Sequence, residues 1–284
     1  VPIVLGGHEH CGFDETIEGT RILKAGSEAA RVHVLDFEWR DGPRRAPTVS
    51  VRLVPVSEHA EDPRLRQLVE KHMRPVRALE RATLLELAPG QTLSSIGARA
   101  RQTSMGTLIC SRLRDVLGAE ACVFNGGGIR AAHEYPTRLT YGDLEAEVPF
   151  DNEVDVVAIP GAVLRDAVAS SRAAAPVETG GFLQVDDRMR LDADEKTLLE
   201  VAGAPLDPDR SYRVALVREL LFGLDRIEPF ARFGREHPEC VPPVGSSRTP
   251  KELLTRSFSL QLWRELGGFD VLDADHDGRV TSGE

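Results

Sequence analysis

A glycine-rich turn next to an arginine is the stretch of this sequence best suited to hold an anion. The run Asn125-Gly-Gly-Gly-Ile-Arg130 follows an apolar stretch, residues 121–124. Glycine lets the backbone approach a ligand closely, and a turn at the end of a strand can offer its N–H groups to an anion. The Arg130 guanidinium adds a planar fork that can hold a phosphate or carboxylate with two hydrogen bonds. A simple flexible turn and a surface ion-pair partner are the alternatives.

Two further arginines and an aromatic ring flank this turn. Arg99 and Arg101 lie upstream, and Phe150 lies downstream. Guanidinium groups pair with phosphate oxygens. The chain is rich in arginine, so one such residue carries little weight and several near one motif carry more.

The order of these segments resembles the C-terminal substrate-binding domain of the 5'-nucleotidase family. This family comprises two-domain metallophosphoesterases that include ecto-5'-nucleotidase and the bacterial UDP-sugar hydrolases. The resemblance covers the chain from Val1 to roughly Leu221. The motifs that carry it are Met105-Gly106 at a helix start, Asn125 to Arg130, Pro149-Phe150, and Phe182-Leu183-Gln184-Val185.

The resemblance implies roles for individual residues. The implied substrate-binding residues are Arg99, Arg101, Asn125, Gly127, Arg130 and Phe150. Arg99 and Arg130 would meet the phosphate, with Arg101 as a less central helper. Asn125 would contact the base and Phe150 would stack on its ring. Phe150 has a plain alternative as an aromatic side chain of the core.

Two departures from the family pattern concern the substrate. Relatives usually carry Gly-Asn-Leu and then Asp-Ala, where this chain has Gly106-Thr107-Leu108 and Ser111-Arg112. A later Gly-Gly-Asp-Gly-aromatic segment supplies the second stacking ring in the family. The nearest match here, Gly223-Leu224-Asp225-Arg226-Ile227, lacks the aromatic residue, and Phe222 and Phe230 are the candidates to replace it. Without a second ring the base site is open, which favours a sugar phosphate or another phosphoester.

A pair of histidines near the start of the chain can bind metal. Gly6-Gly7-His8-Glu9-His10 follows a short strand pattern from Val1 to Leu5. Alternate residues of an extended segment face the same side, so His8 and His10 can present both imidazoles to one ion of the Zn, Mn, Fe or Ni class. A polar loop that happens to contain two histidines is the alternative.

The same motif resembles the Gly-Gly-His-x-His sequence that closes the dinuclear metal site of the family. The resemblance therefore implies two divalent transition metals of the Zn, Mn or Fe class in the full-length protein. It also implies that the remaining ligands and a catalytic His-Asp pair come from a region preceding Val1. The missing half of the metal domain is thus an expected partner of this chain, and no catalytic residue is assigned within it.

The end of the chain has the spacing of a 12-residue EF-hand calcium loop. Carboxylates fall at positions 1, 3, 5 and 12, with glycine at position 6. The candidate ligands are Asp273, Asp275, Asp277, the carbonyl of Arg279, and Glu284. Calcium binds six or more oxygens around one point, and this spacing brings them together. A merely acidic, solvated tail is the alternative.

Composition limits the partners. The chain has 284 residues, of which 41% are hydrophobic and 28% charged, which suits one large or two modest globular domains. The formal net charge of −10 argues against nucleic acid as a partner, so an anionic small molecule needs a local cationic site. No apolar run approaches the roughly 20 residues of a membrane span. The resemblance favours a secreted or periplasmic location, and a cytoplasmic one stays open.

The pattern of strands and helices predicts a mixed α/β (α+β) fold. The expected domains are residues 1–60, the last strands of a metallophosphatase domain; 61–85, a linking helix; 86–248, a substrate-binding domain with a mixed sheet and flanking helices; and 249–284, a helix and the calcium loop. We expect Pro75 to kink the linking helix or to start a second one.

Local signals place several elements within these domains. We expect strands at residues 20–23, 31–39, 48–55, 121–125 and 153–159, and helices at residues 104–117 and 162–171. Thr140 with Asp143, and Thr249 with Glu252, have the spacing of capping boxes. The helix after Thr249 is expected to bury Leu253, Leu254, Phe258 and Trp263.

The cysteines show no metal-type spacing. They are Cys11, Cys110, Cys122 and Cys240. Cys110 lies on the helix before the glycine turn and Cys122 on the strand that leads into it. Extracellular members of the family carry a disulfide at matching positions. A disulfide and two buried free thiols both stay open.

Together these features favour a portion of a dinuclear-metal phosphohydrolase of the 5'-nucleotidase or UDP-sugar hydrolase type. The enzyme would remove phosphate from nucleotides, and this segment, inactive by itself, would bind the substrate. One alternative is a phosphatase for a non-nucleotide phosphoester such as a sugar phosphate. Another is a non-catalytic calcium-binding module. A dinucleotide-binding oxidoreductase is disfavoured because no Gly-x-Gly-x-x-Gly with a downstream acidic residue is present.

Overall fold

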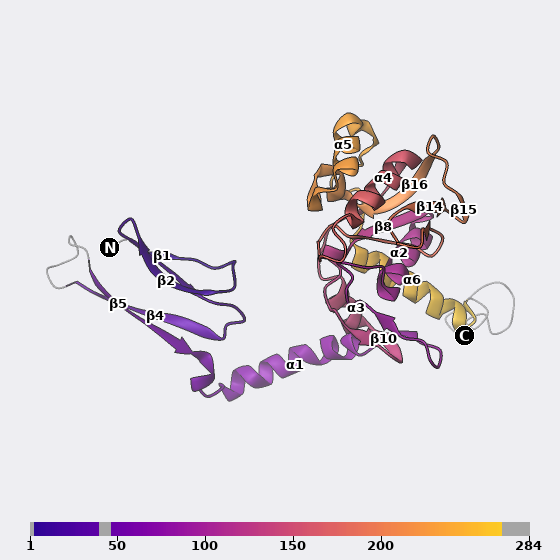
Figure 1. Cartoon of the computed structure of the whole chain (residues 1–284). Helices are drawn as coiled ribbons and strands as arrows, with labels where there is room; N and C mark the ends of the chain where they lie inside the picture. Colours follow the sequence, from indigo (N-terminus) through magenta and orange to yellow (C-terminus); the bar gives the residue numbers. More distant parts are fainter. Residues whose placement is uncertain (1–2, 40–46, 269–284) are drawn as a thin grey trace. The chain divides into compact units, whose positions relative to one another are not determined.

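A computed structural model describes residues 3–39 and 47–268 of the chain (Figure 1). The chain divides into two compact units, Val1–Arg74 and Pro75–Glu284. The boundary lies inside the long helix α1, Pro63–Glu80. The calcium-loop residues predicted from Asp273 to Glu284 lie outside the described residues.

The described residues of the N-terminal unit form five strands in two sheets. The strands are β1 (Ile3–Leu5), β2 (Gly12–Ile17), β3 (Thr20–Ala25), β4 (Arg31–Glu38) and β5 (Thr48–Pro55). The first sheet has the order β1-β3-β2, with β1 parallel and β2 antiparallel to β3. Strands β4 and β5 form an antiparallel pair whose register runs from Arg31 opposite Pro55 to Glu38 opposite Thr48. Strand β2 was not predicted, whereas β3, β4 and β5 were.

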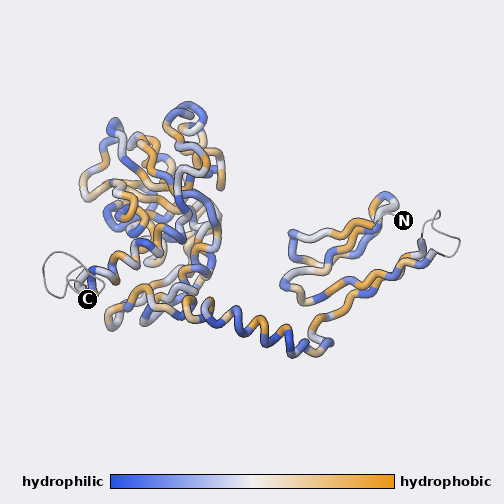
Figure 2. Tube along the Cα trace, turned by 180° about the vertical axis from the view of Figure 1, so that it is seen from behind, coloured by the Kyte–Doolittle hydropathy of each residue, from blue (hydrophilic) through white to orange (hydrophobic). Residues whose placement is uncertain are grey.

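Helix α1 differs from the predicted linking helix. It ends at Glu80, and the short strand β6 (Thr83–Glu86) occupies the residues that the apolar spacing assigned to the last helical turn. Pro75 starts no second helix and lies inside α1. Figure 2 shows apolar and polar residues alternating along this helix, yet none of its residues is buried.

The C-terminal unit is built on a four-stranded sheet. Its order is β11 (Val154–Pro160), β16 (Ser211–Val217), β8 (Ala121–Asn125) and β12 (Leu183–Val185). Strands β8 and β16 are parallel, and the outer two are antiparallel to their neighbours. All five residues of β8 are buried, which agrees with its apolar sequence. The mixed α/β class predicted from the sequence is confirmed.

Helices and short strands surround this sheet. The helices are α2 (Ser104–Leu117), α3 (Tyr141–Glu147), α4 (Gly161–Arg172), α5 (Glu228–Glu236) and α6 (Pro250–Glu265). The short strands are β7 (Leu93–Ser94), β9 (Glu134–Tyr135), β10 (Arg138–Thr140), β13 (Arg190–Leu191), β14 (Leu198–Val201) and β15 (Ala204–Pro205). Helix α2 packs against β8, β12 and β16, and α6 packs against α2.

Side-chain caps explain where α2, α3 and α6 begin. The Thr103 hydroxyl accepts a hydrogen bond from the Gly106 amide at the start of α2. Thr140 and Asp143 form a capping box at α3, and Thr249 and Glu252 form one at α6, as the sequence predicted. Each satisfies backbone amides that have no partner within the helix.

The structure bears on the residues that helix α6 was expected to bury. Leu253, Leu254 and Phe258 are buried as expected, but Trp263 is 43% exposed, so its assignment to the core is wrong. The last turns of α6 extend past the surface that buries the first.

Cys110 and Cys122 are buried free thiols, and burial raises the pKa of Cys122, which keeps it protonated.

No helix among the described residues is long and apolar enough to cross a membrane.

Candidate functional site

The glycine turn begins where strand β8 ends. Asn125 is the last residue of β8, and Gly126–Gly128 forms one 3-10 turn, η2. A Cβ atom on Gly126 would lie 2.2 Å from the Ala98 carbonyl oxygen, and one on Gly127 would lie 3.0 Å from the Gly180 Cα. Any side chain at these positions would push the neighbouring backbone away. The glycines therefore let two distant segments close on the turn.

The backbone amides of this turn are engaged by the protein itself. The Gly126 N–H donates to the Phe182 carbonyl at 2.8 Å, and the Gly127 N–H donates to the Gly180 carbonyl at 2.7 Å. The expectation that these amides are offered to an anion is therefore wrong for both residues. A donor already bonded to a backbone carbonyl is not free for a ligand. Neither of these two amides is therefore a donor for an anion, and the guanidinium groups near the turn are the cationic candidates.

Arg130 and Phe150 lie together at the surface. The Arg130 guanidinium carbon is 5.7 Å from the centroid of the Phe150 ring. Arg130 is exposed, and Phe150 is 46% exposed, so the alternative of Phe150 as a core residue is excluded. A ring held beside a guanidinium by a cation–π contact offers a flat apolar face and a set of donors to the same ligand.

Arg99 lies beside the glycine turn. A Cβ on Gly126 would be 3.1 Å from the Arg99 Cα, so the two backbones are in contact. The Arg99 side chain is half-buried, and its Nε is buried with no hydrogen-bond partner among the described residues. A buried cationic donor without a partner is unusual in a folded protein and is often explained by a ligand.

Arg101 has a different environment from Arg99. Its Nε and Nη2 both donate to the Ile96 carbonyl, at 3.1 and 3.0 Å. A Cβ on Gly97 would lie 2.8 Å from the Arg101 Nε, so the guanidinium folds over that glycine. Two of its donors are thus used to close residues 96–101 into a tight loop. This geometry favours a structural role for Arg101 more than contact with a ligand.

The loop that carries both arginines is held from beneath by Gln184. This side chain is fully buried on β12. Its Nε2 donates to the carbonyls of Ala98 and Arg101, at 2.8 and 2.7 Å, and its Oε1 accepts from the Thr103 amide at 2.9 Å. A Cβ on Gly106 would lie 2.1 Å from the Gln184 Oε1, which explains why glycine occupies the first turn of α2.

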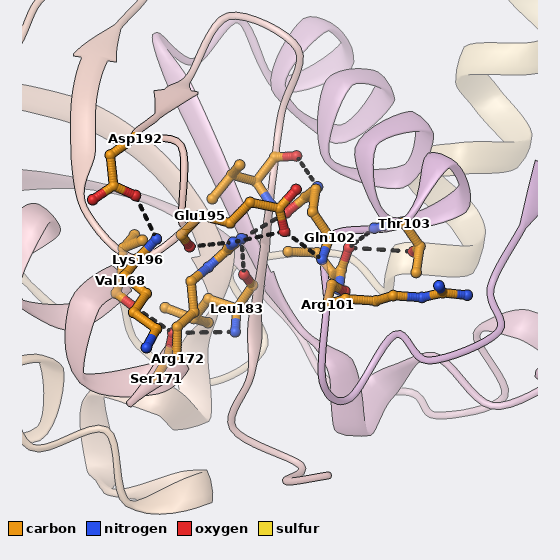
Figure 3. Close-up of polar contacts among 12 residues, drawn as sticks. Arg101, Gln102, Thr103, Val168, Ser171, Arg172, Leu183, Asp192, Glu195 and Lys196 are labelled. Carbon is orange, nitrogen blue, oxygen red and sulfur yellow. Dashed lines mark hydrogen bonds and ion pairs between the residues drawn. The ribbon is translucent and has the colours of Figure 1, made fainter. Parts of the chain in front are cut away.

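A buried arginine supports the far end of the same loop (Figure 3). Arg172 is 1% exposed, and its Nη2 donates to the Gln102 Oε1 at 2.6 Å and to the Leu183 carbonyl at 2.7 Å. Its Nη1 donates to the Glu195 carbonyl at 2.8 Å. Burial lowers the pKa of Arg172 to about 10, which still leaves it cationic near neutral pH. Figure 3 shows the Arg101 side chain pointing away from this network.

Asn125 is hydrogen-bonded to Asp225, which lies in a turn with a strained backbone. Its Nδ2 donates to the Asp225 Oδ2 at 2.6 Å, and a Cβ on Gly180 would lie 2.6 Å from the Asp225 Oδ1. Asp225 and Arg226 both have φ of 57°, a left-handed conformation that costs energy for side chains other than glycine. Sequence reasoning noted this segment only for its lack of an aromatic ring. The glycine pair before Phe182 was a signal that could have pointed to it.

The structure narrows the search for a second stacking ring. Ile227 occupies the expected position and is 2% exposed, and Phe230 is fully buried. Phe230 is therefore not available to a ligand. Phe222 is exposed, and the Arg218 guanidinium carbon lies 4.7 Å from its ring centroid. Phe222 remains as the candidate, and Phe150 is the ring that lies beside the Arg130 guanidinium.

The two histidines lie in a turn and not in an extended segment. Strand β1 ends at Leu5, and His8 and His10 have φ of 77° and 56°. The predicted alternation of an extended strand is therefore wrong here, because the preceding glycines let the chain turn back, with the Glu9 N–H donating to the Gly7 carbonyl. No group of three or more potential metal ligands occurs within the parts of the chain that the structure describes.

Comparison with known proteins finds related sequences. The family model "5'-nucleotidase, C-terminal domain" matches residues 82–232. Protein UshA of Yersinia enterocolitica is 25% identical in an alignment of 235 residues that covers 73% of this chain and 40% of that protein. The 5'-nucleotidase of Homo sapiens is 31% identical in an alignment of 158 residues that covers 46% of this chain and 28% of that protein.

A solved structure shows the same fold. It is a putative 5'-nucleotidase from Staphylococcus aureus in complex with alpha-ketoglutarate, with a TM-score of 0.61 and 16% sequence identity. The match covers 91% of this chain and 53% of that one. The chain thus spans about half the length of this structure, and about two fifths or less of the two sequence relatives named above.

Proposed function

The chain belongs to the 5'-nucleotidase family through its C-terminal domain, and on that premise we propose that its C-terminal unit binds the substrate of an enzyme that removes phosphate from nucleotides. The observation that carries this proposal is the convergence of separate segments on the glycine turn. Arg99 lies in backbone contact with the turn, and Arg130, at its end, is beside Phe150.

Each of these side chains suits one part of a nucleotide. Arg130 is exposed and has planar donors for phosphate oxygens. Arg99 is half-buried beside the turn and adds a second guanidinium group for the phosphate. The Phe150 ring is exposed on a face where a base can stack. Asn125 keeps its Oδ1 as an acceptor for a base amine, and Gly127 permits close approach of the loop backbone.

The metal centre of the whole enzyme is a further part of the proposal. His8 and His10 offer imidazole donors suited to Zn, Mn or Fe, and two such ions, when bound, polarise a phosphoryl group and activate water. Two donors do not complete a dinuclear shell, and the described residues bring no third ligand to them. We therefore expect the 284-residue chain by itself to release no phosphate.

The position expected to carry a second stacking ring supports a second candidate substrate. Ile227 is buried where relatives were expected to have an aromatic residue, so a second ring would have to come from the exposed Phe222. A sugar phosphate needs no second ring. Phe150→Ala separates the two candidates, because it should weaken binding of AMP much more than binding of glucose 1-phosphate if a base stacks there.

The C-terminal segment gives a separate proposal. Asp273, Asp275, Asp277, the Arg279 carbonyl and Glu284 have the spacing of a calcium loop. Calorimetry in millimolar Ca²⁺ should give heat with the wild-type chain and none with the Asp273→Ala, Glu284→Gln double variant. Equal heats from both would leave an acidic tail that binds no calcium.

A phosphate-release screen tests the enzymatic proposal. The protein that contains this chain should release phosphate from nucleotides or sugar phosphates with Mn²⁺, Zn²⁺ or Mg²⁺, and a His8→Ala, His10→Ala variant should not. Absence of release from every substrate would favour the non-catalytic binding module. A secreted or periplasmic location, which the family resemblance favours, is tested by fractionating the cells that produce it.

A further inference from the structure

A carboxyl group is buried directly behind the glycine turn. Glu147 is the last residue of α3, and it is fully buried. Its Oε1 accepts from the Ser95 Oγ at 2.7 Å and from the Tyr135 Oη at 2.8 Å, while its Oε2 is buried without a hydrogen-bond partner among the described residues. A carboxyl in such a place is costly to a fold, so its position calls for a reason.

The contacts of Glu147 join the segments that carry the candidate substrate residues. Ser95 precedes the loop of Arg99, and the Ala98 N–H donates to the Ser95 carbonyl at 3.0 Å. The Glu147 carbonyl itself accepts the Arg130 N–H at 2.9 Å. Phe150 follows three residues later in the chain. One residue therefore contacts, or is continuous with, all three segments.

The segment between Arg130 and Tyr135 is held by the same hydrogen-bond network through Ser95. The His133 N–H donates to the Ser95 Oγ at 2.9 Å, and the His133 ring meets the Tyr135 ring edge-on with centroids 4.9 Å apart. Burial raises the pKa of Glu147, whereas Ser95, Tyr135 and the Ala131 amide act in the opposite direction. The hydroxyl bonds thus hold the carboxylate in place and are held by it in return.

We propose that Glu147 is a positioning residue that sets the spacing of Arg99, Arg130 and Phe150 for the ligand. The proposal rests on the function proposed above, because it gives the three residues a common ligand. If Glu147 has a purely structural role, replacing it should lower the free energy of unfolding but leave Arg99, Arg130 and Phe150 in the same arrangement in the protein that remains folded. If it is a positioning residue, the arrangement of these three side chains should change even in the folded protein.

The first test reads the arrangement without any ligand. In protein labelled with nitrogen-15 arginine, the Arg130 Nε–H resonance is assigned by its loss in Arg130→Lys, and the ring-current shift from Phe150 is measured with Phe150→Leu. Glu147→Gln should move the Arg130 resonance toward its position in Phe150→Leu. Asp143→Asn, on the same helix, removes the charge of the capping box, changes no hydrogen bond of Ser95 or Tyr135, and should leave the resonance in place.

A gentler variant covers the case in which Glu147→Gln does not fold. Tyr135→Phe removes only the hydroxyl that donates to Glu147 and should move the same resonance in the same direction, by less. An unchanged Arg130 resonance in folded Glu147→Gln, or in Tyr135→Phe where Glu147→Gln does not fold, would overturn the proposal.

The second test measures affinity for AMP by calorimetry. Glu147→Gln should lose about tenfold in affinity because small displacements of paired groups weaken binding steeply. In the double variant with Arg130→Ala, the loss should be smaller than the sum of the single losses, since Glu147 acts through Arg130. Fully additive losses would contradict the positioning role. If the wild-type chain binds neither AMP nor glucose 1-phosphate, the proposed function fails, while the resonance test still decides the role of Glu147.

Discussion

The two compact units of this chain treat their apolar side chains in opposite ways. The C-terminal unit buries a continuous core that includes β8, β16, α2 and α6. In the described part of the N-terminal unit, Leu23 is the only large apolar side chain that is buried. The exposed large apolar residues described there are Val4, Leu5, Ile17, Val32, Phe37, Trp39, Leu53, Val56, Leu65, Leu68 and Val69.

The difference teaches that an apolar strand pattern and a buried strand are not the same thing. Strands β4 and β5 pair over eight residues each, yet none of their residues is buried, and a two-stranded hairpin by itself is marginally stable in water. Strand β8, which has a higher share of apolar residues, is covered by α2 and flanked by two strands. Burial, and not pairing, supplies most of the stabilising free energy.

The largest difference between the two units is expected when one phenylalanine in each is replaced. Phe230 is fully buried in the C-terminal unit, whereas Phe37 is 47% exposed and stacks on Trp39. Phe230→Ala should lower the free energy of unfolding by about 3–5 kcal/mol because it leaves a cavity. Phe37→Ala should change it by no more than about 1 kcal/mol. Urea unfolding of both variants measures the difference, and equal losses would show that the two units are stabilised alike.

Two ion pairs extend the comparison to charged groups. The Arg114 Nη1 lies 2.6 Å from the Asp186 Oδ1, with both side chains almost fully buried, whereas the pair of Arg21 and Asp14 is exposed. Asp186→Asn should cost about 2–3 kcal/mol, because it leaves a buried guanidinium with weaker partners. Asp14→Asn should leave the unfolding midpoint unchanged. If Asp14→Asn lowers the unfolding midpoint as much as Asp186→Asn does, burial is not what makes the Arg114–Asp186 pair important for stability.

A smaller effect is expected from pH. Burial raises the pKa of Glu147 above its ordinary value of 4.5, so the folded protein keeps this proton at pH values where the unfolded chain has lost it. The free energy of unfolding should therefore fall as pH rises from 4.5 to the folded-state pKa, and stay level above it.

One variant isolates this contribution. Glu147→Gln should remove that part of the pH dependence, which is read as the difference between the two stability curves. Asp14 in the N-terminal unit has the opposite sign, since Arg21 lowers its pKa. A pH dependence identical in wild type and Glu147→Gln would mean that Glu147 has the same pKa in both states.

The sequence predicted the elements whose signals are local. The apolar run of Ala121 to Asn125 and the start and end of α2 agree with the structure, because caps and strand patterns depend on neighbouring residues. Capping also placed α3 and α6 correctly. The exposure of Trp263 was missed, since helical spacing does not tell where the supporting surface ends.

The candidate site was predicted in part for the same reason. Arg130 and Phe150 were singled out by their motifs, and they lie side by side. The Asp225 bond to Asn125 and the contact of Gly180 with the glycine turn join residues far apart in the sequence. So does the Glu147 network. Tertiary contacts of this kind leave no local pattern, and only the folded chain reveals them.

Titration of the 284-residue chain with AMP tests most directly the claim that the C-terminal unit binds a phosphoester at the glycine turn. Arg130→Lys should weaken binding by about 1–3 kcal/mol, because a point charge replaces a planar fork. Arg138→Lys, at another exposed arginine of the same unit, is the matched control and should bind as wild type. Equal affinities of wild type and Arg130→Lys, or no binding of AMP or glucose 1-phosphate by the wild type, would contradict the account.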